Sequence, residues 1–467
     1  MIQLYNTLTK KRERLPKLKK GKPLRLFVCG PTVYDYSHIG HARVYLTFDM
    51  LARYLRYKKQ PVFYLQNITD IDDKIIDRAH QSKQKPAQVA KQFEKAYYED
   101  MKALDVSSVT KYAPASQFIK EIIVQIKKLI KKKFAYKISS GVYFRVKKFK
   151  NYGQLSKQDL NELRPGYRTE PDPEKEDVFD FGLWKLKKQK WEPSWSSPWG
   201  TGRPGWHIED TAISEKFFGP QYDIHGAAAD LKFPHHEAEI AQQESASGKK
   251  PFVKLWVHTG FLTVEGKKMS KSLGNFITIR SYLKKFSPES LRFIALSHYY
   301  RSPIDYQEDL ARQAERALMN LRNFLVRLEL MQEEGKSGLN VTGLTKSAEK
   351  NFEAALADDF NTPDAISALF FLINQMEPMV WDLRKDEAQF VKRFLMKKFA
   401  IFGIQMEKFL AIPPKIQELL KQRELYRTSK QFVQSDALRK QMDALGYLIE
   451  DTRKGPLLYS KRLTTND

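Results

Sequence analysis

The first 70 residues contain two short apolar runs separated by a helical pattern, and this order restricts the fold more than any other feature. The segment LRLFVCG at 24–30 is an apolar run followed by proline, as expected for a buried strand. From Ile39 to Tyr57 the apolar residues recur at the spacing of one helix face, and VFYLQNITD at 62–70 indicates a second strand. Strand, helix and strand in this order predict a βαβ unit and therefore a parallel sheet.

The middle of the chain, about 110–205, departs from this pattern. It contains a basic helical stretch at 116–133, a strand-like GVYFRV at 141–146 and a passage rich in Pro, Trp and Gly at 191–206. Prolines and glycines at that density favour irregular connections over regular elements. We therefore predict an insertion into the sheet domain, with the chain returning to the sheet near Trp206.

The remainder of the chain predicts a late strand and then a long helical region. FVKLWVHTGFLTVEG at 252–266 predicts a strand with a hairpin, and helical patterning dominates from Ser287 to the end. GKSGLNVTG at 335–343 indicates a linker. DDFNTP at 358–363 predicts the start of a helix, with Asp or Asn as its cap and proline in its first turn.

Composition excludes several classes of protein. The 467 residues are enough for roughly two to four domains, and 42% hydrophobic with 29% charged residues is typical of a soluble globular protein. No apolar run approaches the roughly 18 residues that a membrane span needs, and the N-terminus lacks the apolar core of a secretory signal. The single cysteine, Cys29, excludes an internal disulfide, so we expect a cytoplasmic protein.

The formal net charge is +25, from 80 Lys and Arg against 55 Asp and Glu. Basic residues concentrate at 10–25, 127–133 and 147–150. An excess of this size indicates a polyanionic partner, most simply nucleic acid, although charge does not distinguish RNA from DNA. A lysine-rich composition spread over a solvated surface is the alternative interpretation.

The tetrapeptide His38-Ile39-Gly40-His41 lies where the first predicted helix begins. A helix N-terminus presents unpaired N–H groups and a positive partial charge, so it favours phosphate. Two histidines at this place can donate to phosphate oxygens, and Gly40 lets a nucleotide approach the backbone. The same residues also fit a buried or capping role.

A second motif lies some 230 residues later, in the glycine-flanked loop EGKKMSKSLGN. Lys268 and Lys271 can close over a triphosphate and neutralise the charge that builds on a leaving pyrophosphate. A lysine-rich loop alone is typical of a solvated surface. An HIGH tetrapeptide after a first strand together with KMSKS after a late strand, however, is similar to the signature of class I aminoacyl-tRNA synthetases.

The segment FPHHEAEI places His235 and Glu239 four residues apart, on one face of a helix. Imidazole and carboxylate both bind zinc, so this pair predicts half of a metal site. The alternative is a hydrogen-bonded pair without a metal.

The chain resembles the cysteinyl-tRNA synthetases in six segments, which follow in the family's order over essentially the whole length: FVCGPTVYDYSHIGHAR, NITDIDDKI, GRPGWHIE, FPHHEAEIAQ, DDFNTP and GYLIEDT. The resemblance implies an α/β fold. It consists of a Rossmann-like parallel-sheet catalytic domain with an inserted connective domain, followed by a C-terminal α-helical bundle. The expected boundaries are 1–115 and 206–265 for the two catalytic halves, 116–205 for the insertion, 266–302 for the KMSKS and stem-contact region, and 303–467 for the helical anticodon-binding region.

In that family an active-site zinc ion binds the thiolate of the substrate cysteine, and the resemblance implies its ligands here. Cys29, His235 and Glu239 match three family positions, but Asp210 stands where the family has a second cysteine. We expect zinc to be retained, because a carboxylate oxygen is an accepted zinc donor and the formal ligand charge is unchanged. A harder ligand set excludes competing hard metals less well. The alternative is that the metal is lost.

The resemblance further implies that L-cysteine and ATP give cysteinyl-adenylate, and that the acyl group then passes to the 3′ end of tRNA(Cys). The residues expected to stabilise the phosphates are His38, His41, Lys268 and Lys271. Gly40 and Ser270 are also expected to bind the ATP, which Mg²⁺ accompanies. Thr69 and Trp206 are expected to line the cysteine pocket with Cys29, His235 and Glu239. Cys29 is expected to be a ligand, since the sequence shows no base-and-orienter pattern beside it.

Three residues near the C-terminus, Arg427, Asp436 and Asp451, match family positions that read anticodon bases. Arg and Asp can hydrogen-bond to base edges in an unpaired loop. Each also fits a surface salt bridge. We expect a monomer with no membrane partner.

Two other functions remain open. One is a ligase of similar catalytic core that joins activated cysteine to an amino-sugar, although the long helical region after Ser302 argues against it. The other is a catalytically impaired or metal-free paralogue that acts as a tRNA-binding protein, for which Asp210 is the motivating feature.

Overall fold

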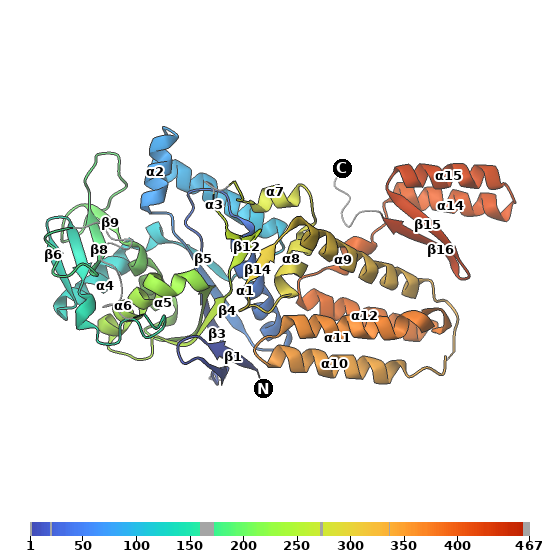
Figure 1. Ribbon diagram of the computed structural model, residues 1–467, viewed down its shortest axis with the longest axis horizontal. Coiled ribbons are helices and arrows are strands. Elements are labelled where there is room, and N and C mark those ends of the chain that lie inside the picture. The colour runs from blue at the N-terminus through green and yellow to red at the C-terminus, as the bar shows by residue number, and fades with distance from the viewer. Residues whose placement is uncertain (1, 19–20, 159–171, 271–273, 336, 461–467) are drawn as a thin grey trace. The chain divides into compact units, whose positions relative to one another are not determined.

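The computed structural model describes residues 2–18, 21–158, 172–270, 274–335 and 337–460. The chain folds into two compact units (Figure 1). The first comprises residues 1–282, 300–305 and 358–360, and the second comprises 283–299, 306–357 and 361–467. Each unit is described by itself below.

A five-stranded parallel sheet forms the centre of the first unit, in the order β11-β10-β3-β4-β5. The strands are β3 (Leu24–Val28), β4 (Val62–Ile68), β5 (Lys111–Pro114), β10 (Tyr222–Ala228) and β11 (Val253–Thr259). The predicted βαβ unit is confirmed, since α1 (Ile39–Tyr57) connects β3 to β4, which are parallel neighbours. The predicted late strand at 252–266 is β11 followed by a short hairpin.

Helix α1 packs against β4, β10 and β11 of this sheet. The contact is close at Gly226, where an added Cβ would lie 2.4 Å from the ring of Phe48, so only glycine lets the helix approach the strand so nearly. The other helices of the sheet domain are α2 (Asp73–Gln81), α3 (Pro86–Ala103), α5 (Trp206–Phe218) and α6 (Glu237–Ser247), and α7 (Ile279–Leu283) follows the lysine loop.

The segment between β5 and α5 adds helix α4 (Ile119–Lys131) and a four-stranded antiparallel sheet. Its strands run in the order β6 (Ala135–Ile138), β7 (Gly141–Phe144), β8 (Phe181–Leu186) and β9 (Gly202–Pro204). Helix α4 and strand β7 agree with the predicted helix at 116–133 and the predicted strand at 141–146. The smaller strands of the unit are β1 (Gln3–Asn6), β2 (Lys11–Arg14), β12 (Leu262–Val264), β13 (Lys267–Lys268) and β14 (Ile304–Tyr306).

The second unit is mainly helical, as expected. Helices α9, α10, α11 and α12 pack on one another, and Figure 1 shows the last three side by side. Its helices are α8 (Pro288–Leu296), α9 (Glu308–Glu329), α10 (Val341–Ala357), α11 (Thr362–Met376), α12 (Lys385–Ile401), α13 (Met406–Leu410), α14 (Pro414–Thr428) and α15 (Phe432–Ala444). Asn361 caps α11 by accepting from the backbone N–H of Asp364, which confirms the predicted helix start.

Two features of the second unit were not predicted from the sequence. Strands β15 (Tyr447–Thr452) and β16 (Gly455–Ser460) form an antiparallel hairpin, which buries Ile449 and Leu458 against Ile416 and Met442 of α14 and α15. Helix α10 begins at Val341, inside the segment predicted to be a linker.

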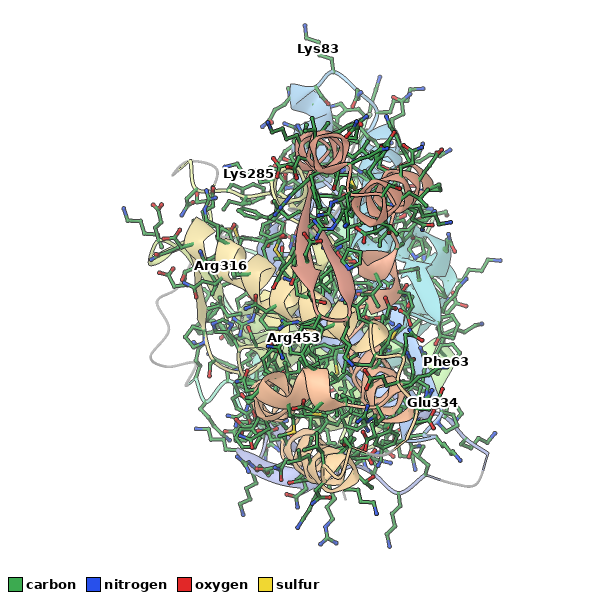
Figure 2. All side chains as sticks on the ribbon, turned by 90° about the vertical axis from the view of Figure 1, so that its right-hand side faces the viewer. Phe63, Lys83, Lys285, Arg316, Glu334 and Arg453 are labelled. Carbon is green, nitrogen blue, oxygen red and sulfur yellow. The ribbon has the colours of Figure 1, made fainter. Side chains whose placement is uncertain are left out.

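Many basic side chains point into solvent. Figure 2 shows Lys83 extending away from the ribbon, and Lys285 and Arg316 are exposed as well. Among the residues that the structure describes, no helix combines the length and the apolar character that crossing a membrane requires.

Candidate active site

A pocket of about 1430 Å³ opens in the first unit, at the carboxyl ends of β3 and β10. These two strands are neighbours, but the chain leaves β3 toward β4 and β5 and later adds β10 and β11 on the other side. Ligands of open parallel sheets bind at such a reversal of strand order. The described lining residues include eight that were predicted for the site: Cys29, His38, Gly40, His41, Trp206, Asp210, His235 and Lys268.

His38 has a structural role and also faces the pocket. It is the N-cap of α1, where its Nδ1 accepts from the backbone N–H groups of Gly40 at 3.1 Å and His41 at 3.3 Å. The Nδ1 atom of His41 in turn accepts from the backbone N–H of His38 at 3.4 Å. Because both Nδ1 atoms are acceptors, each neutral ring carries its proton on Nε2. The predicted capping role of His38 is therefore correct. It leaves the Nε2–H groups of His38 and His41 available for a ligand.

Both imidazoles are kept neutral at physiological pH. Burial, with help from the neighbouring His41, lowers the pKa of His38 to about 2. Burial together with Lys74 lowers the pKa of His41 to about 4. The two rings stack with centroids 3.8 Å apart, an arrangement that two imidazolium ions would oppose.

The lysine loop meets the first motif at the start of α1. A Cβ on Gly40 would lie 2.9 Å from the Cε atom of Met269, so the glycine leaves the space that Met269 uses. The backbone N–H of Ile39 donates to the carbonyl oxygen of Ile277 at 3.1 Å, which ties the segment after the loop to the same helix start. The two predicted motifs therefore lie together. Lys271 lies outside the described residues, and Lys268 is exposed on β13.

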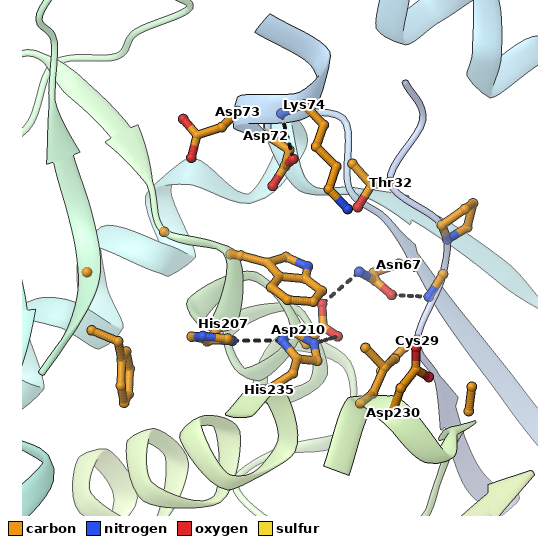
Figure 3. Close-up of a pocket in the computed structure, with 18 of the residues that line it drawn as sticks. Cys29, Thr32, Asn67, Asp72, Asp73, Lys74, His207, Asp210, Asp230 and His235 are labelled. Atoms are coloured by element: carbon orange, nitrogen blue, oxygen red, sulfur yellow. Dashed lines mark hydrogen bonds and ion pairs between the residues drawn. The ribbon is translucent and has the colours of Figure 1, made fainter. Parts of the chain in front are cut away.

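A buried group of potential metal ligands lies at the inner end of the pocket. One ligand atom from each of Cys29, Asp210, His235 and Glu239 lies within 4.8 Å of the others. Nε2 of His235 is 3.2 Å from Oδ2 of Asp210 and 3.0 Å from Oε1 of Glu239. Figure 3 shows Cys29, Asp210 and His235 converging from three different segments. The structure thus brings the four predicted ligands together.

A second set of potential ligands shares Cys29 and Glu239 with the first and adds His225 and His236. The Sγ atom of Cys29 lies 3.1 Å from Nε2 of His225 and 3.3 Å from Nε2 of His236. The described residues that line the pocket include Asp210 and His235 but neither of these two histidines. A ligand entering from the pocket therefore meets three residues of the first set, Cys29, Asp210 and His235, but only Cys29 of the second.

Electrostatics at this group favour a cation. Glu239 is fully buried, and its oxygens have no hydrogen-bond partner among the described residues. Burial and the charge of Asp210 raise the pKa of Glu239 well above its usual range. Burial and the charges of Asp210 and Glu239 likewise raise the pKa of the Cys29 thiol. Buried carboxylates are costly unless they are paired or bind a metal, and a divalent cation would relieve all three groups. The residues present therefore fit a metal ion.

Outer contacts hold the first set in place. The side-chain amide of Asn67 donates to Oδ1 of Asp210 at 2.7 Å, which leaves Oδ2 facing His235. Nδ1 of His235 lies 2.8 Å from Nδ1 of His207, and Figure 3 marks this contact. A proton on Nδ1 of His235 would leave its Nε2 lone pair for a metal, and such outer partners commonly fix the tautomer of a metal-binding histidine.

The histidines around Cys29 were not predicted from the sequence, and one of them corrects the prediction that no base-and-orienter grouping lies beside Cys29. Nε2 of His225 lies beside the Cys29 thiol, and its Nδ1 contacts the Tyr222 hydroxyl at 2.6 Å. A base-and-orienter grouping therefore does accompany Cys29. Burial nevertheless raises the pKa of the thiol and lowers that of His225, so both groups are held neutral and neither is poised for nucleophilic attack.

Comparison with known proteins agrees with this geometry. The family model for the catalytic domain of class I tRNA synthetases of type C matches residues 16–316, and the DALR domain matches residues 351–407. The chain belongs to the cysteinyl-tRNA synthetase family. A cysteine–tRNA ligase of Caldicellulosiruptor saccharolyticus is 42% identical, with 97% of this chain and 98% of that protein covered. One of Thermococcus onnurineus is also 42% identical, with 98% of each chain covered.

Solved class I synthetases share the fold at low sequence identity. The leucyl enzyme in a ternary complex from Agrobacterium radiobacter has a TM-score of 0.65 at 11% identity, over 85% of each chain. The methionyl-tRNA synthetase of Mycobacterium tuberculosis with methionyl-adenylate has a TM-score of 0.58 at 14% identity, over 83% of this chain and 91% of that one. The predicted fold class is confirmed.

The two remaining residues predicted for the cysteine pocket of this synthetase occupy different places. Trp206, the first residue of α5, stacks on His235 with ring centroids 4.2 Å apart and faces the pocket. Thr69 is fully buried, and its hydroxyl donates to Glu209 at 2.9 Å. It is not among the described residues that line the pocket.

The second unit of the synthetase carries the three residues predicted to read the anticodon. Asp451 on β15 accepts from both terminal nitrogens of Arg423, at 2.9 and 2.8 Å, and lies 3.2 Å from Arg427. Asp436 on α15 is exposed. Arg427 and Asp451 thus lie together as an ion pair, and Asp436 is not part of it.

Proposed function

We propose that this chain is a cysteine–tRNA ligase, which forms cysteinyl-adenylate from L-cysteine and ATP and transfers the cysteine to tRNA(Cys). The similarity to cysteine–tRNA ligases over 97% of the chain is the main support, because it covers both units. The group of ligands at the inner end of the pocket supports the same proposal. A monomeric, cytoplasmic enzyme remains the expected form.

The start of α1 would hold the phosphates of ATP. Nε2–H groups of His38 and His41 would donate to phosphate oxygens, and the dipole of α1 would add a positive partial charge at its N-terminus. Because both rings are neutral, they act as hydrogen-bond donors whose strength does not change between pH 5 and 8. Gly40 would keep the backbone accessible to the nucleotide.

Positive charge for the leaving pyrophosphate would come from the lysine loop. Lys268 lines the pocket, and Lys271 is assigned the same role from the sequence, since it lies outside the described residues. No chain residue needs to act as a nucleophile, because the carboxylate of cysteine itself attacks the α-phosphate. Positioning and charge neutralisation therefore carry the catalysis, with Mg²⁺ accompanying the ATP.

Cys29, Asp210, His235 and Glu239 would hold a zinc ion at the inner end of the pocket. The chemistry that zinc supplies when bound is a direct bond to the substrate thiolate, which the protonated hydroxyl of serine matches poorly. Asn67 would orient Asp210, and His207 would orient His235. The Trp206 ring, stacked on His235, would cover the substrate and limit access of water.

Cysteine-dependent exchange of pyrophosphate into ATP tests this function. We expect exchange with cysteine at a rate far above that with serine, and charging of tRNA(Cys) when the tRNA is added. Exchange with another amino acid but not with cysteine would show that the assignment is wrong. Binding of tRNA without any exchange would favour the tRNA-binding paralogue instead.

A further inference from the structure

Trp191 is the one tryptophan, among the residues that the structure describes, whose side chain is largely exposed. Its relative exposure is 48%, whereas Trp184 and Trp256 are fully buried. The ring lies in the Pro- and Trp-rich passage between β8 and β9. A large aromatic surface held in water is a common feature of sites that bind another molecule.

The Trp191 ring borders two neighbouring hollows. It lines the active-site pocket, and it also lines a second hollow of about 600 Å³ between the end of α2 and the start of α3. His80 lies against it, with ring centroids 5.6 Å apart and the planes tilted by 33°. The ring is therefore held at the rim of the active-site pocket.

Exposed lysines lie around Trp191, and the carboxylates of Asp73, Asp77 and Asp172 line the active-site pocket as well. Five exposed lysines flank it in the sequence or line the same hollows: Lys83, Lys85, Lys187, Lys188 and Lys190. Figure 2 shows Lys83 reaching into solvent. The adjacent carboxylate, Glu192, does not offset this charge at the surface, because its side chain is only 9% exposed and accepts from Arg203 at 2.7 Å.

We propose that Trp191 is a stacking platform for an unpaired base at the 3′ end of the tRNA, and that these lysines hold the adjoining phosphates. The proposal rests on the proposed function, because the 3′ end must enter the active-site pocket to receive the cysteine. An aromatic ring within a basic groove is the arrangement by which proteins bind single-stranded nucleic acid, since every base offers a π-face.

The charge of the rim decides between possible occupants. A single-stranded RNA carries one phosphate for each base, so it matches alternating aromatic and basic groups. A second copy of this chain, with a net charge of +25, would be repelled by the same lysines. Trp191 lines both hollows, so an extended ligand that reached from one to the other would pass the ring.

Replacement of Trp191 by alanine tests the proposal. Loss of one base–aromatic stack should raise the KM for tRNA and the Kd for tRNA about tenfold. Trp191→Phe should restore most of the affinity, because phenylalanine keeps a face for stacking. The matched control is Phe217→Ala, which removes a ring that is 37% exposed on α5 and is not among the described residues lining either hollow. It should leave both constants within twofold of the unchanged protein, a range of about 0.4 kcal/mol.

A tRNA that lacks its unpaired 3′ nucleotides locates the contact. Trp191→Ala should weaken binding of the full tRNA and leave binding of the shortened tRNA unchanged. Equal weakening with both RNAs, or no weakening with either, would overturn the proposal. Cysteine-dependent exchange tests the proposed function separately from the role of Trp191, since absence of exchange in the unchanged protein would refute the proposed function itself. A Trp191→Ala variant that loses exchange and tRNA binding together would show a structural role for the ring and would also overturn the proposal.

Discussion

Carboxylates at the inner end of the pocket and carboxylates on the C-terminal hairpin have opposite environments. Glu239 is fully buried without a hydrogen-bond partner among the described residues, and its pKa is raised by burial and by Asp210. Asp451 is held by Arg423, whose hydrogen bonds lower its pKa. A carboxylate whose counter-charge lies in the chain is already satisfied, whereas a buried carboxylate without one requires a cation from outside. The two regions therefore predict different responses to the same kind of substitution.

The largest effect is expected at Glu239, because both ligand sets include it. Glu239→Gln should lower the metal content from about one per chain to almost none, and cysteine-dependent exchange should fall by two or more orders of magnitude, about 3 kcal/mol or more. Elemental analysis after gel filtration and the exchange assay measure these quantities.

Glu237 provides the matched control for Glu239 on the same helix. Its carboxylate is buried but accepts from the backbone N–H groups of Gly153, Leu155 and Ser156. Glu237→Gln should cost stability and leave the metal content of the folded protein unchanged. Full metal content in Glu239→Gln would contradict the contrast between unsatisfied and satisfied carboxylates.

Asp210 and His236 distinguish the two ligand sets. Asp210→Asn should weaken metal binding by more than about 100-fold, whereas His236→Gln should have the effect of an outer contact, about 10- to 100-fold. Asp210→Cys should bind zinc more tightly, because a soft thiolate suits zinc better than a carboxylate does. Competition with a chelator gives the affinities, and the visible spectrum of the cobalt-substituted protein reports the ligand set. A larger loss in His236→Gln would assign the metal to the deeper set.

His38 separates a structural role from a binding role at the helix start. His38→Asn keeps a side-chain acceptor for the cap, so the protein should remain nearly as stable, while the rate of adenylate formation should fall about 100-fold. In His38→Ala the rate of adenylate formation should fall by a similar factor, and the free energy of unfolding should fall by a further ~1 kcal/mol because the cap is lost. Thermal unfolding and single-turnover adenylation measure the two effects. Equal stability of both variants would contradict the capping role.

The pH dependence of adenylate formation gives a further check on His38 and His41. Burial lowers both pKa values below the ordinary value near 6.5, so neither ring gains a proton until the pH falls well below 5. We therefore expect the rate of adenylate formation to show no change near pH 6.5 that arises from His38 or His41. The pH profiles of the unchanged protein and of the His38 variants should have the same shape in this range. Because both pKa values are lowered, protonation opposes folding, and stability falls as the pH drops below about 6.5.

The smallest effect is expected at Asp451. Asp451→Asn should cost about 1–2 kcal/mol of stability, because Arg423 loses its charged partner near the surface. The pKa of Asp451 is lowered, so this contribution is complete above about pH 4 and is lost only as the pH falls through the folded-state pKa. The KM for tRNA should rise by severalfold at most, and cysteine-dependent exchange should not change. Loss of exchange in Asp451→Asn would contradict the separation between the two regions.

Local patterns predicted the elements that position the site. The βαβ unit and the cap of α11 depend on periodicity and capping, which neighbouring residues determine. The pair of His235 and Glu239 was found for the same reason, since the two residues lie four apart in the sequence, His235 just before α6 and Glu239 in its first turn. The hairpin of β15 and β16 was missed because its apolar residues are few, and their burial depends on packing against α14 and α15.

The wider histidine group could not be found from sequence spacing. His225 lies on β10 and Cys29 follows β3, and 196 residues separate them. Only the strand order of the sheet makes them neighbours. A histidine within an otherwise apolar strand, as in YDIHGAA, is the signal that could have indicated His225. The hydrogen bond by which Asn67 orients Asp210 joins residues 143 apart in the sequence, so no local sequence pattern could have predicted it.

Asp210 also changes how the site responds to oxidation. A metal centre with two neighbouring thiolates that loses its ion in air can close a disulfide, and the site must then be reduced before metal can return. Here Cys29 faces a carboxylate, and the chain has no second thiol. Thiol oxidation at this site can act only on Cys29, which is 5% exposed. Metal-stripped protein should therefore regain its ion without a reductant, which makes loss of the metal a reversible event for this chain.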